Sequence, residues 1–366
     1  MWQANPNPWS KSEPAKWSHY SDVENLIIEE MFSRNQPRAI FDRYYIDFKH
    51  MIQTFNDDHH KQRPVKRVEC NKEHKHLREE RFMIAPITAK RSAGGEYGWI
   101  SPFIIEVRRD LGLKKNQLPS KDEKLIPELV EKAALGIIEE GTQIERRCEA
   151  EKLANLLREK KYKKFKEVWE HCAYLYSLES FLYKSLNEAM RSVGKKEHEQ
   201  LWRSKIRTLG PFSLLLWDDP INKKVKRDTN LYRGAELKPE DIAMYKDLVK
   251  NPDEYRSFQA FTSCSRNRAR AEGFGNTLFI IKVLFAFTAD ISSISQYKEE
   301  EEELVTPGVC FCVQNVQFDS KTNKHLITLQ LIQRWSSKCE ERFLDDFDTI
   351  LTVFLNASML TWQLIK

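Results

Sequence analysis

Three short motifs in the second half of the chain bring together a guanidinium, a hydroxyl and carboxylates. Arg233 and Gly234 end a short apolar run, Ser263 lies in the sequence Phe-Thr-Ser-Cys-Ser, and Glu299–Glu303 precede Leu-Val-Thr-Pro. A guanidinium binds a pyrophosphate well through its planar fork of donors, and a carboxylate beside a sugar ring stabilises an oxocarbenium-like cation. Each motif alone is also typical of a surface turn, a strand end or a solvated loop. Their order and spacing together are more specific than any one motif.

A polar pair precedes these motifs on an aromatic, amphipathic segment. Asn187 and Arg191 lie four residues apart in Tyr183–Arg191, so on a helix they share one face. In the order helix, arginine, serine, glutamate, the chain resembles the mono-ADP-ribosyltransferases of the clostridial-toxin-like and vertebrate arginine-specific type. The resemblance covers roughly Phe165–Arg334.

The resemblance implies the catalytic residues Arg233, Ser263, Glu301 and Glu303. Glu303 is expected to contact the ribose 2′-hydroxyl, with Ser263 holding its carboxylate. Because residues two apart on a strand share a face, Glu301 and Glu303 are expected to point into one cleft. In the family, the first glutamate of such a pair goes with arginine as the acceptor.

The position of the glutamate pair within the five-glutamate run is taken from the family pattern. There the last glutamate precedes two apolar residues and then a proline, here Leu304, Val305 and Pro307. Glu300 and Glu302 remain the alternative pair.

The resemblance also implies NAD as the substrate, with no metal. The residues expected to contact NAD are Asn187, Arg191, Arg233, Gly234, Ser263 and Phe274. Because the first triad residue is arginine and not histidine, the poly-ADP-ribose polymerase pattern is not matched. We therefore expect transfer of single ADP-ribose units to a protein substrate with an acceptor arginine, with release of nicotinamide. NAD glycohydrolase activity and a catalytically inert ADP-ribose-binding scaffold are the alternatives.

The first 70 residues contain a second constellation. Trp9, Trp17 and Glu29, with the stretch Tyr44–Gln53, resemble the WWE domain, named for two tryptophans and a glutamate. That family has a half-open β-barrel holding one helix, and many members bind the iso-ADP-ribose unit of poly-ADP-ribose. The residues expected to bind ADP-ribose are Trp17, Tyr20, Tyr44, Gln53 and Arg63. ADP-ribosylated or ubiquitin-linked proteins are the corresponding partners.

One wall of this expected pocket departs from the family. Ligand-binding members carry an aromatic residue two positions after the first tryptophan and an arginine soon after, whereas this chain has Lys11 followed by Ser-Glu-Pro. Trp17 and Tyr20 could equally be barrel core, and a protein-interaction role for this domain remains open.

The elements that position these residues follow from periodicity. Val23–Arg34 has apolar residues at helical spacing, with Asp22 as the expected N-cap. Ala39–Phe55 and Arg63–Cys70 are expected to form strands, and Met1–Pro8 a loose start. Helices are expected in Pro127–Lys164 and Val168–Arg191. Short β-like runs follow: Leu214–Trp217, Asn230–Tyr232, Gln259–Ser263, Thr277–Phe285, Glu302–Pro307, Val309–Phe318 and His325–Ile332.

This order of elements predicts an α+β chain of four parts. They are a WWE-like half-barrel with one helix (1–70), a charged linker and helical connector (71–164), an ADP-ribosyltransferase domain (165–335) and a C-terminal extension (336–366). The transferase fold implied by the resemblance has helices plus two packed β-sheets around an NAD cleft.

Composition excludes several other classes of protein. The 366 residues include 59 basic and 54 acidic residues and 41% hydrophobic residues, which is too balanced for a histone-like polycation and apolar enough for real cores. Direct DNA binding is not expected. No signal peptide or membrane span is expected, and Ile350–Ile365 is interpreted as a packed helix or strand pair. The seven cysteines are expected to be reduced thiols of an intracellular protein, in the cytoplasm or nucleus. No pair has zinc-site spacing, and Cys70, His74 and His76 are interpreted as part of a solvated linker.

Overall fold

The computed structural model describes residues 2–5, 17–68, 101–114, 117–193, 196–220, 229–251 and 255–332. Trp9, the Cys70–His76 cluster, much of the expected linker and the C-terminal extension lie outside these ranges.

The N-terminal domain is an antiparallel six-stranded sheet with one helix. Its strands are β1 (Trp2–Ala4), β2 (Ser18–His19), β3 (Arg38–Ile40), β4 (Tyr44–Asp47), β5 (Ile52–Phe55) and β6 (Gln62–Arg67). They lie in the order β2-β1-β6-β5-β4-β3, and the helix is α1 (Asp22–Ser33). The domain thus has the barrel-like sheet and single helix that the WWE resemblance implies.

The expectation of a loose start at Met1–Pro8 is wrong for its first residues. Trp2 is fully buried and pairs with Arg67 of β6, and its Nε1 donates to Glu29 at 2.9 Å. The sheet therefore begins at Trp2, because a buried indole needs both apolar contacts and a partner for its N–H.

The N-cap of helix α1 lies one residue earlier than expected. Ser21, and not Asp22, is the N-cap: its hydroxyl accepts from the Glu24 backbone N–H, and the Glu24 carboxylate accepts from the Ser21 N–H at 2.8 Å. This capping box satisfies two N–H groups that the first turn leaves without helical partners. Asp22 is consequently free to bond to groups outside the helix.

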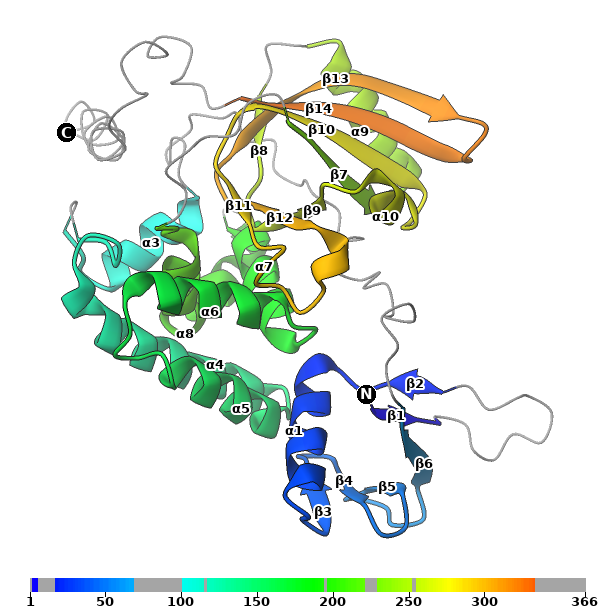
Figure 1. Cartoon of the computed structure of the whole chain (residues 1–366). Helices are drawn as coiled ribbons and strands as arrows, with labels where there is room; N and C mark the ends of the chain where they lie inside the picture. Colours follow the sequence, from blue (N-terminus) through cyan, green and yellow to red (C-terminus); the bar gives the residue numbers. More distant parts are fainter. Residues whose placement is uncertain are drawn as a thin grey trace.

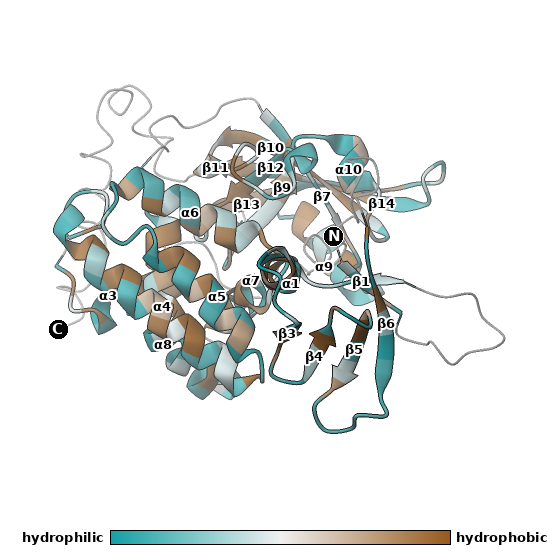
Figure 2. Cartoon of the chain, turned by 60° about the horizontal axis from the view of Figure 1, so that its bottom comes forward, coloured by the Kyte–Doolittle hydropathy of each residue, from teal (hydrophilic) through white to brown (hydrophobic). Residues whose placement is uncertain are grey.

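Six helices form the layer that supports the second half of the chain. They are α3 (Pro102–Asp110), α4 (Ile126–Gln143), α5 (Arg147–Arg158), α6 (Phe165–Ser177), α7 (Phe181–Ser192) and α8 (Glu199–Trp217), with short 3₁₀ turns η2 (Glu123–Leu125) and η3 (Lys196–His198). Figure 2 shows hydrophobic and hydrophilic stripes on α4, α5 and α8, as expected of helices that bury one side. Residues of all six helices share one hydrophobic core, so α3–α5 pack directly on the helices that follow.

Leu214–Trp217, expected as a β-like run, is the last turn of α8. Leu214, Leu215 and Leu216 are all buried, so this turn has no solvent-facing side to reveal helical periodicity.

The sheet layer contains eight strands. They are β7 (Thr229–Ala235), β8 (Arg256–Ser257), β9 (Thr262–Ser265), β10 (Thr277–Phe285), β11 (Thr288–Asp290), β12 (Glu302–Val305), β13 (Cys310–Asp319) and β14 (Lys324–Ile332), and with them lie α9 (Pro239–Val249), α10 (Arg268–Glu272) and the 3₁₀ turn η4 (Lys298–Glu300). Two sheets, β11-β12-β9 and β7-β10-β14-β13-β8, join through the single pair Tyr232–Ser265. The helices lie against this layer (Figure 1), which confirms the expected α+β class.

None of the helices in the described ranges has the combination of length and apolar composition that crossing a bilayer requires.

Candidate functional site

Arg233 lies where the two C-terminal sheets meet. It is a residue of β7, only 4% of it is exposed, and its Nη1 donates to the Ser263 carbonyl of β9 at 2.6 Å. The guanidinium is therefore anchored by the backbone of the serine motif.

Glu303 lies one strand further along, on β12. It is fully buried and pairs with Cys264 of β9, so Glu303 and Cys264 share a face of the sheet. Burial raises the pKa of the Cys264 thiol to about 12, and the charges of Arg233 and Glu303 both act on it. Cys264 is thus a neutral residue between the arginine and the glutamate.

Two further residues contact the Glu303 carboxylate. Thr288 of β11 donates from Oγ1 to Glu303 Oε1 at 2.5 Å, and Arg266 Nη1 lies 3.6 Å from Glu303 Oε2. Arg266 also pairs with Asp290, whose pKa is lowered because the effects of Arg266 and Ser292 outweigh burial. No sequence motif marks Thr288 or Arg266, and only the strand pairing brings them to Glu303.

The expected contact between the Ser263 hydroxyl and Glu303 differs from the observed register. Ser263 pairs with Leu304, one residue beyond Glu303. Since neighbouring residues on a strand point to opposite faces, the Ser263 side chain lies on the face opposite Glu303. Ser263 contributes to this arrangement through its carbonyl, which holds Arg233.

Glu301 is not part of a regular strand, so the alternation used to align it with Glu303 does not apply. It is exposed, follows η4 and has φ 46° and ψ 48°, in the left-handed region. Arg266 N–H donates to its carbonyl at 3.2 Å. Of the alternative pair, Glu302 is buried on the Ser265 face, and Ser295 donates to its carboxylate at 3.3 Å.

Asn187 and Arg191 of α7 approach the same region from the helical layer. Burial lowers the pKa of Arg191, and the Arg233 charge is close enough to lower it further, while Tyr176 acts in the opposite direction. Asn187 Nδ2 donates to Tyr176 Oη at 2.7 Å, and the buried Asn187 Oδ1 accepts no hydrogen bond within the described residues. Two neighbouring guanidiniums and an open amide acceptor fit an anionic, polar ligand. Sequence reasoning missed Tyr176 because its position matches an apolar helix face.

Gly234 and Phe274 are adjacent in the fold. A Cβ at Gly234 would lie 2.3 Å from the Ala271 carbonyl oxygen and 2.6 Å from Phe274 Cβ. Phe274 itself is almost completely buried. Gly234 is therefore required by the close approach of α10, beside the anchored arginine.

No cluster of three or more potential metal-ligating side chains occurs in the described ranges.

A cavity of about 470 Å³ lies in the N-terminal domain and brings together four of its five expected ligand-binding residues: Tyr20, Tyr44, Gln53 and Arg63. Tyr20 Oη donates to Gln53 Oε1 at 2.7 Å, and Arg63 lies over the Phe55 ring at 4.9 Å. Trp17 is not in the lining; its ring carries the Lys66 ammonium at 4.1 Å.

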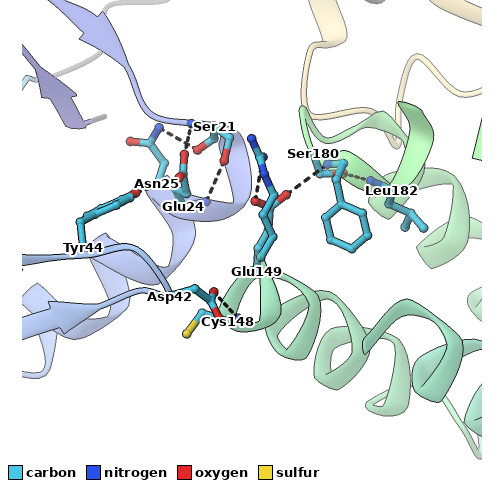
Figure 3. Close-up of polar contacts among 11 residues, drawn as sticks. Ser21, Glu24, Asn25, Asp42, Tyr44, Cys148, Glu149, Ser180 and Leu182 are labelled. Atoms are coloured by element: carbon cyan, nitrogen blue, oxygen red, sulfur yellow. Dashed lines mark hydrogen bonds and ion pairs between the residues drawn. The ribbon is translucent and has the colours of Figure 1, made fainter. Parts of the chain in front are cut away.

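The opposite wall of this cavity comes from the helical layer. Ile144, Glu145, Arg146 and Glu149, at the junction of α4 and α5, complete the lining. The lining holds four carboxylates and three guanidiniums, and each carboxylate already accepts hydrogen bonds. Glu149, for example, accepts from Phe181 N–H and from Arg146, both at 3.2 Å (Figure 3). Burial raises the pKa of Glu149 to about 7.

Comparison with known families finds a match in two separate parts of the chain. Residues 160–337 match the family NAD:arginine ADP-ribosyltransferase, and residues 8–67 match the WWE domain. These matches confirm the two resemblances seen in the sequence. No curated protein matches the chain.

Several solved structures are similar to part of this chain. The ADP-ribosyltransferase HopU1 of Pseudomonas syringae pv. Tomato DC3000 is 21% identical, over 49% of this chain and 87% of that one, with a TM-score of 0.40. The type III effector XopAI from Xanthomonas axonopodis pv. citri is 14% identical, over 64% of this chain and 100% of that one, with a TM-score of 0.40. The ADP-ribosyltransferase toxin Vis from Vibrio splendidus is 18% identical, over 55% of this chain and 88% of that one, with a TM-score of 0.35.

Proposed function

We propose that this chain, which carries a WWE domain ahead of an NAD:arginine ADP-ribosyltransferase domain, transfers single ADP-ribose units from NAD to arginine side chains of a protein substrate. The observation that carries the proposal is the meeting of Arg233, Ser263 and Glu303 on the adjacent strands β7, β9 and β12. Arg191 joins them from α7, within range of the Arg233 charge.

These residues divide the reaction between binding and charge stabilisation. Arg191 and Arg233 bind the pyrophosphate, and Asn187 offers its open carbonyl oxygen to a donor on the nucleotide. As the bond from ribose C1′ to the nicotinamide nitrogen breaks, its electron pair neutralises the departing ring and the ribose becomes cationic. The buried Glu303 carboxylate stabilises that cation more than the ground state. An acceptor nitrogen then bonds to C1′ and loses its proton.

Glu301 is proposed to orient the acceptor. It lies exposed at the turn that leads into β12, where an incoming guanidinium can reach it. A carboxylate at this point pairs with the acceptor arginine and receives its proton late, since free arginine is almost never neutral.

Nicotinamide release, measured with and without agmatine as a small arginine mimic, tests the proposal. We expect release together with an ADP-ribosyl-agmatine adduct. Absence of release would contradict the transferase and leave an ADP-ribose-binding scaffold. Release that agmatine does not change, without an adduct, would identify an NAD glycohydrolase.

Glutamine substitutions in the glutamate run test the assignment of roles. Glu303→Gln should abolish nicotinamide release, whereas Glu301→Gln should retain hydrolysis and lose transfer to agmatine. Glu302→Gln is the matched control, because Glu302 is equally buried but lies on the other face of β12. If Glu302→Gln abolished release and Glu303→Gln did not, the alternative pair would be correct.

We propose that the cavity of the N-terminal domain binds the iso-ADP-ribose unit and so directs the transferase to ADP-ribosylated partners. Its support is the aromatic wall of Tyr20 and Tyr44 for an adenine, Gln53 as a donor and acceptor, and Arg63, which pairs with no carboxylate among the described residues.

Calorimetry with iso-ADP-ribose tests this role. Arg63→Ala should weaken binding about tenfold or more, because a charged hydrogen bond to phosphate contributes roughly 1.5–3 kcal/mol. Arg38→Ala is the control: Arg38 also lies over an aromatic ring, that of Tyr45, but outside the cavity. No heat at millimolar ligand would eliminate the proposed binding and favour a role in protein interaction.

A further inference from the structure

The N-terminal domain contacts the turn that leads to Glu301. Asp22, in the first turn of α1, accepts from Tyr297 Oη at Oδ1 and from Glu179 N–H at Oδ2, both at 2.7 Å. Tyr297 is the residue directly before η4, and Glu301 follows η4. A residue 275 positions away in the chain thus bonds directly to the glutamate turn.

Tyr297 is the base of this turn. Its carbonyl accepts from Glu300 N–H at 3.1 Å, and only 7% of the residue is exposed. The far end of the turn is fixed by β9, because Ser265 Oγ donates to the Glu300 carbonyl at 2.6 Å. With its far end fixed by the sheet, the near end depends on what holds Tyr297.

The helical layer adds a weaker attachment next to Tyr297. Gln296 N–H donates to Ser177 Oγ, at the end of α6, at 3.2 Å. Asp22 supplies the charged acceptor, and hydrogen bonds to charged groups are roughly twice as strong as neutral ones. The capping box of Ser21 and Glu24 leaves both Asp22 oxygens available for these contacts outside α1.

The helix that bears Asp22 is itself firmly docked. Val23 belongs to the same hydrophobic core as α3–α8, and Lys152 of α5 pairs with Glu30 at 2.5 Å. In Figure 3 the first turn of α1, with Ser21 and Glu24, lies close to Glu149 of α5. Asp22 therefore presents a fixed acceptor to Tyr297.

We propose that Asp22 is a positioning residue of the transferase: through Tyr297 it fixes the turn that presents Glu301 to the acceptor. The N-terminal domain is then part of the transferase site and not only a targeting module. This inference rests on the proposed function. Since Glu303 lies within β12 while Glu301 lies in the turn, loss of the contact affects transfer to the acceptor more than cleavage of NAD.

Tyr297→Phe removes only the hydroxyl and tests the proposal. Transfer to agmatine should fall about tenfold, the effect of losing one charged hydrogen bond, while NAD hydrolysis stays within about twofold. Asp22→Ala should give the same pattern, and the double variant should be no worse than Asp22→Ala alone, because both changes remove the Asp22–Tyr297 contact. Glu30→Gln, which breaks another contact of α1 with the helical layer, is the control and should leave both rates unchanged.

Hydrogen exchange separates this inference from the proposed function. In Tyr297→Phe the amides of Glu300 and Glu301 should exchange faster than in the unmodified chain, whether or not the protein is active. Unchanged exchange, or an equal fall of transfer and hydrolysis, would overturn the positioning role. Faster exchange in a protein that releases no nicotinamide would instead keep the positioning of the turn and contradict the transferase.

Discussion

At the scale of single residues, a short hydrogen bond from Thr288 holds the Glu303 carboxylate. Thr288 is buried, and its hydroxyl donates to the Glu303 carboxylate at 2.5 Å. A buried carboxylate that loses a donor keeps its desolvation cost without compensation. The hydroxyl of Thr288 thus holds Glu303 in the orientation that the proposed reaction needs.

Thr288→Val is therefore expected to lower nicotinamide release about tenfold and to destabilise the fold by roughly 1–3 kcal/mol. Thr306→Val is a matched control, because Thr306 is equally buried but donates to the Phe287 carbonyl. The control should lose stability and keep its activity. If both variants retained full activity at equal stability, the Thr288 contact would have no part in catalysis. Steady-state kinetics and denaturant unfolding measure the two quantities.

At the scale of elements, strand and helix content could be predicted wherever side chains alternate between core and solvent. Thr277–Phe285 is a strand over the whole predicted range, and the predicted helix Val23–Arg34 is α1 within one residue at each end. The prediction of a strand for Leu214–Trp217 is wrong: the segment is helical, and its three leucines are all buried.

The residues of the candidate site could be predicted from the sequence only in part. Arg233, Ser263 and Glu303 could be selected from motifs, but their relative orientation depends on strand register, which the sequence of one strand does not determine. Glu301 was placed by strand alternation, whereas its left-handed backbone removes it from the strand. Tyr176 of α6, Thr288 of β11 and Arg266, which directly follows β9, carry no local signal. The Asp22–Tyr297 contact spans 275 positions and follows only from the docking of two domains.

The packing of α10 on β7 depends on the absence of a side chain at Gly234. Gly234→Ala would place a Cβ within 3 Å of the backbone of Ala271 and Phe274, so α10 and its following loop must shift. We expect a loss of roughly 1–3 kcal/mol in unfolding free energy and a higher KM for NAD, because Arg233 adjoins this position.

Gly112→Ala provides the contrast for this prediction. Gly112 has φ +63° and nothing within 4 Å of an added Cβ, so alanine there meets only the backbone penalty of about 1 kcal/mol. Its KM for NAD should not change. Equal KM values for the two variants would show that the α10 contact does not influence the NAD site.

At the scale of the whole molecule, the junction between the two domains contains a buried acid. Glu149 of α5 accepts from Phe181 N–H at the start of α7 and from Arg146, and the charge of Glu24 on α1 also acts on it. Burial raises its pKa from 4.5 to about 7. The protonated form is therefore favoured when the chain is folded, and ionisation of this group opposes folding.

The sign of the resulting pH dependence follows from proton linkage. Between pH 4.5 and 7 the folded state binds more protons at Glu149 than the unfolded state, so stability falls as pH rises through this window. The contribution is full below pH 4.5 and is lost by about pH 7, and its size is on the order of 3 kcal/mol. Glu149→Gln cannot ionise, and its amide oxygen can still accept from Phe181 N–H. We expect the variant to gain stability over the unmodified chain across this window and to keep that gain above pH 7.

Denaturant unfolding at a series of pH values measures the difference between the two proteins. Asp218→Asn is the matched control, because burial raises the pKa of Asp218 from 3.8 to about 6 within the helical layer, where Ser120 donates to its carboxylate. The stability that Asp218→Asn gains over the unmodified chain should therefore stop increasing near pH 6. The stability that Glu149→Gln gains should continue to increase to about pH 7. Parallel curves for Glu149→Gln and the unmodified chain would mean that Glu149 stays ionised in the fold. In that case, protonation of Glu149 would not contribute to the stability of the domain junction. Helix α1, which carries Asp22, would then dock equally well at pH 5 and at pH 8.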